Sequence, residues 1–205
     1  MNERTVIEVN EALAKEYSKL AKRNVANVRG INIDPNTSFN PGENVPKLAG
    51  VPTIDPKYRN RIIGEVNLAN TKSTLSTVQG NRISLRADEG SPFNVGTIKS
   101  MKDNVIFHAL EETQIKVGNN VTYGARAIVH GGGRQQLGGG ASTEPTTIED
   151  NVTLKDQAVV FRSLLGKGST VGVKTAVISS EVSPSATIGD RIIYLNNVVF
   201  GTVEW

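Results

Sequence analysis

A six-residue repeat constrains this chain more than any other feature. In the stretch VGNNVTYGARAIVHG, the apolar residues Val117, Tyr123 and Val129 are six residues apart, and Gly118 and Gly124 directly follow two of them. Neither an α-helix, with about 3.6 residues per turn, nor the simple alternation of a strand produces this spacing. Short strands that turn a corner every six residues, each pointing one apolar side chain at a common axis, do produce it. The repeat therefore predicts a parallel β-helix.

The same spacing recurs along the chain from Val95 onward. Between breaks, apolar residues six apart form three further sets: Val95, Met101 and Phe107; Ile148, Leu154 and Val160; and Leu165, Val171 and Val177. Three such hexads make one triangular turn of a left-handed parallel β-helix, so every third apolar residue returns to the same face. The sequence thus predicts an all-β fold, a left-handed parallel β-helix built from hexapeptide repeats.

Counting turns places the two histidines of the chain on neighbouring rungs. The predicted inward stack on one face is Leu85, Phe107, Val129, Val160 and Val177, and the residues that follow these form the outward column Arg86, His108, His130, Phe161 and Ile178. Adjacent rungs are spaced like neighbouring strands, about 4.8 Å apart. His108 and His130 are therefore expected to be vertical neighbours, close enough to share one metal ion. The alternative is a surface or interface pair that binds no metal.

Three regions are predicted along the chain. Residues 1–30 form an amphipathic helix that begins with a capping box, and its apolar stripe is Val6, Val9, Leu13, Tyr17 and Leu20. Residues 31–61 are rich in proline and form an extended arm. Residues 62–205 form the β-helix domain, capped by C-terminal strands. The helix is expected to pack on the side of the β-helix, with a partner-binding or membrane-surface helix as the alternative.

Breaks in the repeat predict where loops leave the β-helix. Residues 62–85 do not keep a strict register, and loops are expected at 89–92, 111–116 and 131–147. The last of these loops is rich in glycine and follows His130 directly, so it is either a lid over a site or a tolerated surface insertion. The C-terminal RIIYLNNVVFGTVEW is rich in β-branched residues and predicts strands, with a turn at Asn196 and Asn197.

Composition excludes several classes of protein. The chain has no cysteine, which excludes disulfides, thiolate metal sites and cysteine nucleophiles. The formal net charge is only +3, and no basic cluster is interleaved with aromatic residues, so no nucleic-acid partner is expected. No apolar run approaches the roughly 20 residues of a membrane span. The N-terminus lacks the apolar segment of a signal peptide, so a cytoplasmic protein is expected.

Three motifs together resemble the γ-class carbonic anhydrases. RADEG begins at Arg86, HALE begins at His108, and VGNN is followed by VHG, which contains His130. The resemblance runs from about residue 62 to 178. It implies a homotrimer that hydrates CO₂ at zinc ions between subunits, with two histidine ligands from one subunit and a third from its neighbour. His108 and His130 match the first and last of these ligands, but the middle one, five residues before the last, is Ala125 here.

The resemblance also implies roles for residues around the histidines. Arg86 and Asp88 match a pair that forms a salt bridge across subunits, Glu89 matches a glutamate near the zinc-bound solvent, and Glu111 matches a proton-shuttle glutamate. Lys102 stands where the family has a glutamine near the active site. A carboxylate such as that of Glu89 would complete a His₂Glu ligand set, which is a known catalytic arrangement for zinc.

Three functions are consistent with these residues. The first is reversible CO₂ hydration, with zinc held by His108 and His130, protons handled by Glu89 and Glu111, and activity weakened or lost through Ala125. The second is a trimeric scaffold or partner subunit of the same family that holds no metal. The third is a hexapeptide acyltransferase that uses a histidine as general base on a CoA thioester. RADEG and HALE argue against the third.

Overall fold

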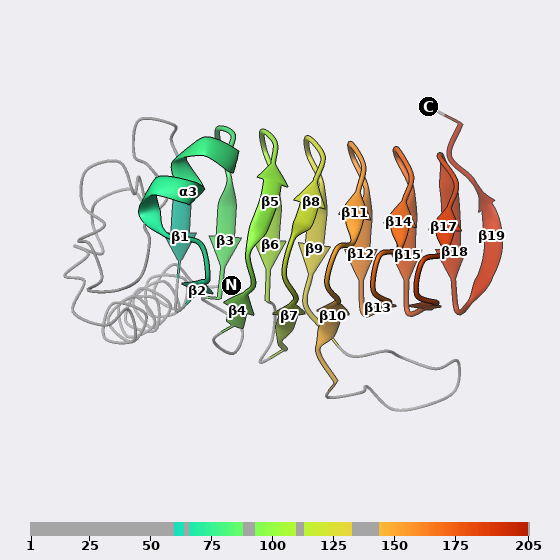
Figure 1. The fold of residues 1–205 in the computed structure, drawn as a ribbon. Helices are drawn as coiled ribbons and strands as arrows, with labels where there is room; N and C mark the ends of the chain where they lie inside the picture. Colours follow the sequence, from blue (N-terminus) through green and yellow to red (C-terminus); the bar gives the residue numbers. More distant parts are fainter. Residues whose placement is uncertain (1–59, 64–65, 88–92, 110–112, 133–143, 205) are drawn as a thin grey trace, which may run out of the picture.

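The computed structural model describes residues 60–63, 66–87, 93–109, 113–132 and 144–204. The helix predicted for residues 1–30 and nearly all of the predicted arm lie outside the described residues. The part that is described is an all-β solenoid of stacked coils, the predicted left-handed parallel β-helix (Figure 1). Among the helices in this part of the chain, none is long and apolar enough to cross a membrane.

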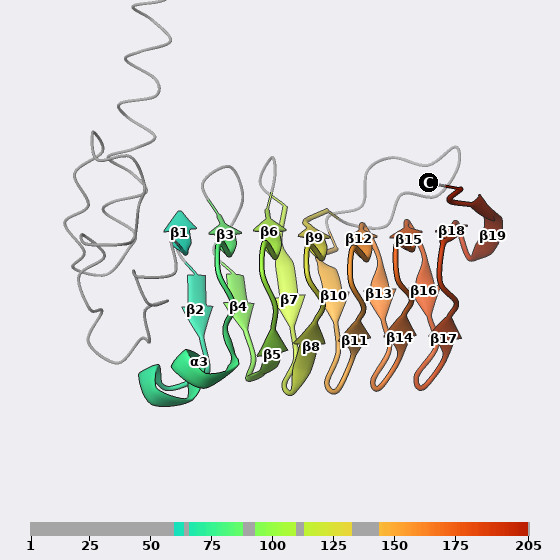
Figure 2. The same cartoon turned by 90° about the horizontal axis from the view of Figure 1, so that it is seen from above.

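Three sheets run along the solenoid, and the chain visits them in the order A, B, C on each coil (Figures 1 and 2). Sheet A contains β1 (Arg61–Ile63), β3 (Ser84–Arg86), β6 (Ile106–His108), β9 (Ile128–His130), β12 (Val159–Phe161), β15 (Ala176–Ile178), β18 (Ile192–Leu195) and β19 (Val198–Thr202). Sheet B contains β2 (Val66–Leu68), β4 (Phe93–Val95), β7 (Ile115–Val117), β10 (Thr146–Ile148), β13 (Leu164–Leu165) and β16 (Glu181–Val182). Sheet C contains β5 (Ile98–Met101), β8 (Val121–Tyr123), β11 (Thr153–Leu154), β14 (Thr170–Val171) and β17 (Thr187–Ile188). We name the corners A/B, B/C and C/A after the sheets that they join.

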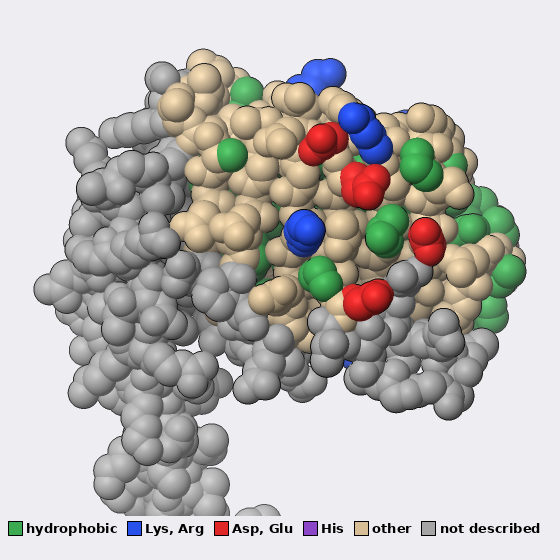
Figure 3. Space-filling view, turned by 60° about the horizontal axis from the view of Figure 1, so that its bottom comes forward, with side chains coloured by type: hydrophobic (Ala, Val, Ile, Leu, Met, Phe, Trp, Pro, Cys, Tyr) green, Lys and Arg blue, Asp and Glu red, His purple; other side chains and the backbone are tan. Residues whose placement is uncertain are grey.

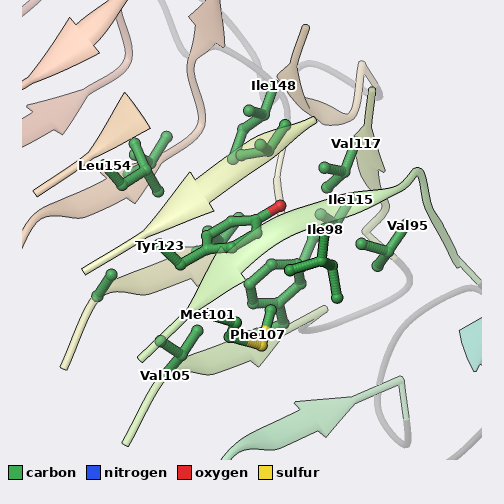
Figure 4. Packing of buried hydrophobic residues seen from close by; sticks show 14 of the residues in the cluster. Val95, Ile98, Met101, Val105, Phe107, Ile115, Val117, Tyr123, Ile148 and Leu154 are labelled. Carbon is green, nitrogen blue, oxygen red and sulfur yellow. The ribbon is translucent and has the colours of Figure 1, made fainter. Parts of the chain in front are cut away.

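The hexad residues fill the interior of the solenoid, as predicted. The inward stack on sheet A is fully buried, with Leu85, Phe107, Val129, Val160 and Val177 all 0% exposed. Aromatic rings pack along the axis around Phe107, whose centroid lies 6.3 Å from that of Phe93. The centroid of Tyr123 lies 5.2 Å from that of Phe107, and Figure 4 shows these two rings together. Close packing of these apolar side chains along one axis holds the coils together.

A short helix, α3 (Lys72–Val78), stands where the first coil would otherwise place a strand of sheet C. Thr71 caps its start, because the hydroxyl of Thr71 accepts a hydrogen bond of 3.3 Å from the backbone N–H of Thr74. Leu75 is 1% exposed and anchors the helix to the core. This helix explains why the six-residue repeat is irregular between residues 62 and 85.

Two buried asparagines complete the hydrogen bonding of the first coils. Asn70 accepts a bond of 2.6 Å from the N–H of Ile98 and donates one of 3.2 Å to its carbonyl. Asn60 likewise accepts from the N–H of Ile83 at 2.8 Å and donates to the carbonyl of Gly80 at 3.0 Å. Each side-chain amide therefore accepts one hydrogen bond from the next coil and donates one to it, as a backbone amide of a paired strand would.

Two of the predicted loops are shorter than expected. Residues 111–116 were expected to be a loop, but β7 begins at Ile115, whose side chain is 2% exposed. Residues 131–147 were also expected to be a loop, but β10 begins at Thr146, which is 0% exposed. Each of these strands therefore begins two residues before the hexad residue, Val117 or Ile148, that the sequence repeat identifies.

The C-terminal strands form a hairpin at one end of the solenoid, as predicted. β19 pairs with β18 in the antiparallel direction, with a bulge between Ile193 and Tyr194. Asn196 and Asn197 form the turn, with φ angles of 49° and 67°. Two successive positive φ angles are the requirement of a type I′ hairpin turn, and asparagine tolerates them well.

Candidate metal centre

His108 and His130 lie side by side on the outer surface of sheet A. They are the last residues of β6 and β9 and are direct partners in the strand register, so the alternation of each strand points Phe107 and Val129 inward and the imidazoles outward. The ring centroids are 5.2 Å apart, and the ring planes are inclined by 70°. The structure confirms the predicted outward column and the adjacency of the two rings.

A backbone contact fixes the orientation of the His130 ring. Nδ1 of His130 lies 3.0 Å from the carbonyl oxygen of Gly131. A carbonyl only accepts hydrogen bonds, so Nδ1 carries a proton, and in the neutral form of the ring the lone pair is then on Nε2. Metal-binding histidines in proteins usually have this arrangement, in which one ring nitrogen donates to a carbonyl and the other faces the ion.

The buried hydroxyl of Thr146 stabilises the corner that follows His130. Its oxygen lies 2.7 Å from the carbonyl oxygen of His130 and 2.8 Å from that of Gly132, and it accepts a bond of 3.0 Å from the N–H of Arg162. Three backbone groups from two segments of the chain therefore meet at one side chain. Such a network limits movement of the strand end that carries the His130 ring.

Aromatic and basic residues bound the histidine pair along the column. The Phe161 ring meets His130 nearly edge-on, at a centroid distance of 4.8 Å and an angle of 86°, and the Arg162 guanidinium lies 4.9 Å from the Phe161 centroid. On the other side, Arg86 is the register partner of His108. The two imidazoles are thus the nitrogen-bearing rings of the column, with an arginine near each end.

The two imidazoles fit zinc as part of a ligand set, but the described part of one chain does not complete the set. Among the residues that the structure describes, no three His, Cys, Asp or Glu side chains are grouped so as to hold a metal ion. Asp88, Glu89 and Glu111, which the sequence assigns to the site, lie outside the described residues. Zinc sites in catalysis usually have three protein ligands. A complete zinc site would therefore need a further ligand from outside the described part of one chain.

Ala125 lies before the start of β9, at the C/A corner, whereas His130 is the last residue of β9. Five residues separate the two, which corresponds to roughly 16 Å along an extended strand. Position 125 and the histidine pair of the same chain therefore lie at opposite ends of β9.

Lys102 lies at the C/A corner too, where it joins a cluster around Asp156. Its side chain is exposed, and Nζ lies 3.2 Å from Oδ1 of Asp156, the same oxygen that accepts a bond of 2.9 Å from the N–H of Ala125. The N–H of Ala125 and, after it, Lys102 lower the pKa of the Asp156 carboxyl. Sequence reasoning missed Asp156, because its partners are far away in the sequence and the residue belongs to no recognisable motif.

The charges on the surface carry little further information about a partner. On the face shown in Figure 3, lysine and arginine side chains are interspersed with aspartate and glutamate. A mixed surface of this kind creates no strong field of one sign.

Comparison with known proteins gives three informative relatives, while no family model matches the chain. The chain is 27% identical over 167 residues to a carbonic anhydrase of Methanosarcina thermophila, covering 72% of this chain and 60% of that protein. It is 25% identical over 147 residues to the carboxysome assembly protein CcmM of Nostoc sp., covering 67% of this chain and 23% of CcmM. The CcmM of Synechococcus elongatus is 26% identical over 143 residues, covering 65% of this chain and 24% of that CcmM. This chain therefore spans less than two thirds of each relative.

Proposed function

Because this chain is a relative of the γ-class carbonic anhydrases, we propose that it forms a cytoplasmic homotrimer in which His108 and His130 hold zinc between subunits. We further propose that it hydrates CO₂ reversibly at this centre, more slowly than a centre with three histidines. The observation that supports this proposal best is the histidine pair itself. The two rings are register partners 5.2 Å apart, and the tautomer of His130 leaves Nε2 available to a metal.

The remaining residues have roles in this proposal that follow from the resemblance of their motifs to the γ-class carbonic anhydrases. A bound zinc ion would supply a hydroxide near neutral pH by lowering the pKa of its water to about 7. Glu89 and Glu111 would accept protons, and Glu89 is also a candidate third ligand. Arg86 and Asp88 would hold neighbouring subunits together. Lys102, by adding positive charge at the corner that also holds Ala125, would weaken metal binding.

The loss of the third histidine also supports a second candidate function, that of a trimeric scaffold without a metal. Two of the relatives are named as carboxysome assembly proteins rather than as enzymes. Ala125 has no side chain that can bind a metal. In this case the trimer would be retained for binding partners, and the histidine pair would be a remnant of the metal centre.

Zinc binding separates the two candidates. We would titrate metal-free protein with zinc by calorimetry and measure CO₂ hydration by stopped flow, for the wild type and for His108→Ala and His130→Ala. Binding of about one zinc per chain that is lost in both variants would support the enzyme. A matched control is Ile178→Ala, two rungs away in the same column, which should leave zinc binding unchanged. An intact wild-type trimer that binds no zinc would rule out the enzyme and leave the scaffold.

A further inference from the structure

The last strand of sheet A has one edge without a partner. β19 (Val198–Thr202) pairs with β18 on one side, and on its other side it pairs with no strand that the structure describes. It lies at the C-terminal end of the solenoid (Figures 1 and 2). Alternate residues of an edge strand direct their backbone N–H and C=O groups away from the sheet. β19 therefore presents a row of groups that can bond to another strand.

The exposed side chains of β19 are mostly apolar. Val198, Val199 and Phe200 are 58%, 63% and 71% exposed, and with Ile106 at 37% they are the exposed large hydrophobic residues of the described part of the chain. Figure 3 shows apolar side chains gathered at this end of the solenoid. Single exposed hydrophobic residues are common on protein surfaces, but three in succession on a sheet edge indicate an interaction surface.

β19 also lacks most of the features that protect a sheet edge. Natural edge strands often carry lysine, proline or another charged residue, which prevents pairing with a second chain. The sequence of β19 is VVFGT, and its one protective feature is the bulge that leaves Phe200 without a register partner on β18. The last strands of the other two sheets differ, because β16 and β17 have only two residues each and expose Glu181 and Thr187. The unprotected edge thus belongs to sheet A.

A second copy of this chain is the occupant that the sequence of β19 favours. Two β19 strands that pair antiparallel are related by a twofold axis, so each edge is completed by its own equivalent. Like charges directly opposite one another destabilise such a pair, and β19 has no charged residue that would be brought against its own copy. A strand adapted to a partner of opposite charge would instead carry charge itself.

We propose that β19 pairs antiparallel with β19 of a second copy, so that two solenoids join end to end. One such contact involves few side chains, whereas specific interfaces usually bury about 1,200–2,000 Å². In the trimer of the proposed function, on which this step rests, the three β19 strands lie at the same end. Twofold axes perpendicular to the threefold axis would then form three contacts at once, and the expected assembly is two trimers joined end to end.

Lysine on the strand should separate the two halves of this assembly. We would compare the wild type with Val199→Lys/Phe200→Lys by light scattering and sedimentation equilibrium over a range of concentrations. Both side chains are more than half exposed, so the variant should fold, and urea unfolding would verify this. The wild type should have twice the mass of the variant, because like charges oppose each other across the contact. The dissociation constant should rise at least about tenfold, and high salt should leave the apolar wild-type contact intact.

A mixture of variants with opposite charges tests whether the strand pairs with its own copy. Val199→Glu/Phe200→Glu should also fail to join when alone. An equimolar mixture of the lysine and glutamate variants should regain the wild-type mass at low salt and lose it at high salt. Thr187→Lys is the matched control, because it adds a lysine to an exposed residue of β17 at the same end of the solenoid. This variant should assemble like the wild type.

Two results would overturn the proposal. One is a wild type whose mass equals that of the lysine variant at every concentration. The other is a mixture of lysine and glutamate variants that stays separate at low salt although the wild type joins.

Zinc titration distinguishes this proposal from the proposed function, because the lysine variant should bind zinc like the wild type. A chain that doubles its mass without binding zinc would refute only the CO₂ hydration. A chain that binds zinc without doubling its mass would refute only the end-to-end contact. A dimer of single chains would support the strand pairing and refute the trimer.

Discussion

Nζ of Lys102 lies 3.2 Å from Oδ1 of Asp156, although 54 residues separate the two in the sequence. The same carboxylate oxygen accepts the hydrogen bond from the N–H of Ala125. The arrangement recurs higher on the same corner, where Lys155 and the N–H of Val173 share Oδ1 of Asp190 at 3.3 and 2.8 Å. The position that matches the missing histidine ligand thus belongs to a repeated arrangement, in which a lysine and a backbone N–H share one carboxylate oxygen.

Removal of the Asp156 carboxylate should destabilise the fold modestly. Asp156→Ala leaves the N–H of Ala125 to water and removes the ion pair, so we expect a loss of about 1 kcal/mol or less in the free energy of unfolding, because the pair is exposed. Asp156→Asn keeps a hydrogen-bond acceptor and should lose less. Urea unfolding at pH 7 would measure both variants. An Asp156→Ala variant as stable as the wild type would show that this carboxylate does not stabilise the fold.

The same carboxylate should contribute to the pH dependence of stability. Its pKa is lowered in the folded state by the N–H of Ala125 and by Lys102. The stabilisation is therefore fully present above the unfolded pKa of about 3.9 and is lost as the pH falls through the lower folded value. The free energies of unfolding of the wild type and of Asp156→Asn should therefore converge over this acidic range. Parallel curves down to pH 2 would show that the carboxylate has no such role.

Restoring the third histidine should increase zinc affinity between chains and not within one chain. Ala125→His lies a strand length away from its own chain's pair, so it acts on a neighbour. We would mix wild-type chains with chains that carry Ala125→His, His108→Ala and His130→Ala together. The mixture should bind zinc at least about tenfold more tightly than either chain alone, since a full ligand set forms only across the contact. Equal affinity in the mixture and in the wild type would show that position 125 of one chain does not reach the histidine pair of another.

Loss of the Tyr123 hydroxyl should leave the fold as stable or make it more stable. Tyr123 is 0% exposed, its hydroxyl has no hydrogen-bond partner among the described residues, and burial raises its pKa, so it stays protonated. Because an unsatisfied buried hydroxyl costs roughly 1–3 kcal/mol, Tyr123→Phe should be neutral or stabilising. Tyr123→Ala is the control and should cost about 3–5 kcal/mol through the cavity that it opens. A strongly destabilised phenylalanine variant would indicate a buried water bound to the hydroxyl.

Two glycines give a matched test of how closely the coils approach each other. A Cβ added at Gly124 would lie 2.3 Å from the backbone N of Asp156, whereas one added at Gly201 would meet nothing within 4 Å. Gly124→Ala must push neighbouring rungs apart and should cost about 1–3 kcal/mol or more. Gly201→Ala should change stability little. Thermal unfolding of the two variants would compare them, and similar melting temperatures would mean that the rungs can separate without cost.

The fold and the histidine column could be predicted because both depend on local spacing. Phe107 and Val129 point inward because they recur at the hexad position, and His108 and His130 then follow on the outer face. One count along the chain determines both results. The pairing of each strand with the strands on the neighbouring rungs follows from the same count.

The features that sequence reasoning missed depend on contacts or strain that no repeat encodes. The helix Lys72–Val78 is mostly polar and has only two apolar residues, Leu75 and Val78, and only its cap at Thr71 marks its start. The pairing of Lys102 with Asp156 spans two coils. The left-handed backbone at Arg82 and Arg126 was not expected, because arginine is not a residue that signals such a turn.

The reversed direction of β19 also limits how the solenoid can grow. Each parallel strand of sheet A could serve as a template for an identical strand above it, as happens in fibrils. β19 is antiparallel to β18, so a coil arriving at this end would meet a strand of the wrong polarity. Duplication of coils would have to occur before Ile192, and filaments built by continuing the same winding are blocked at this end.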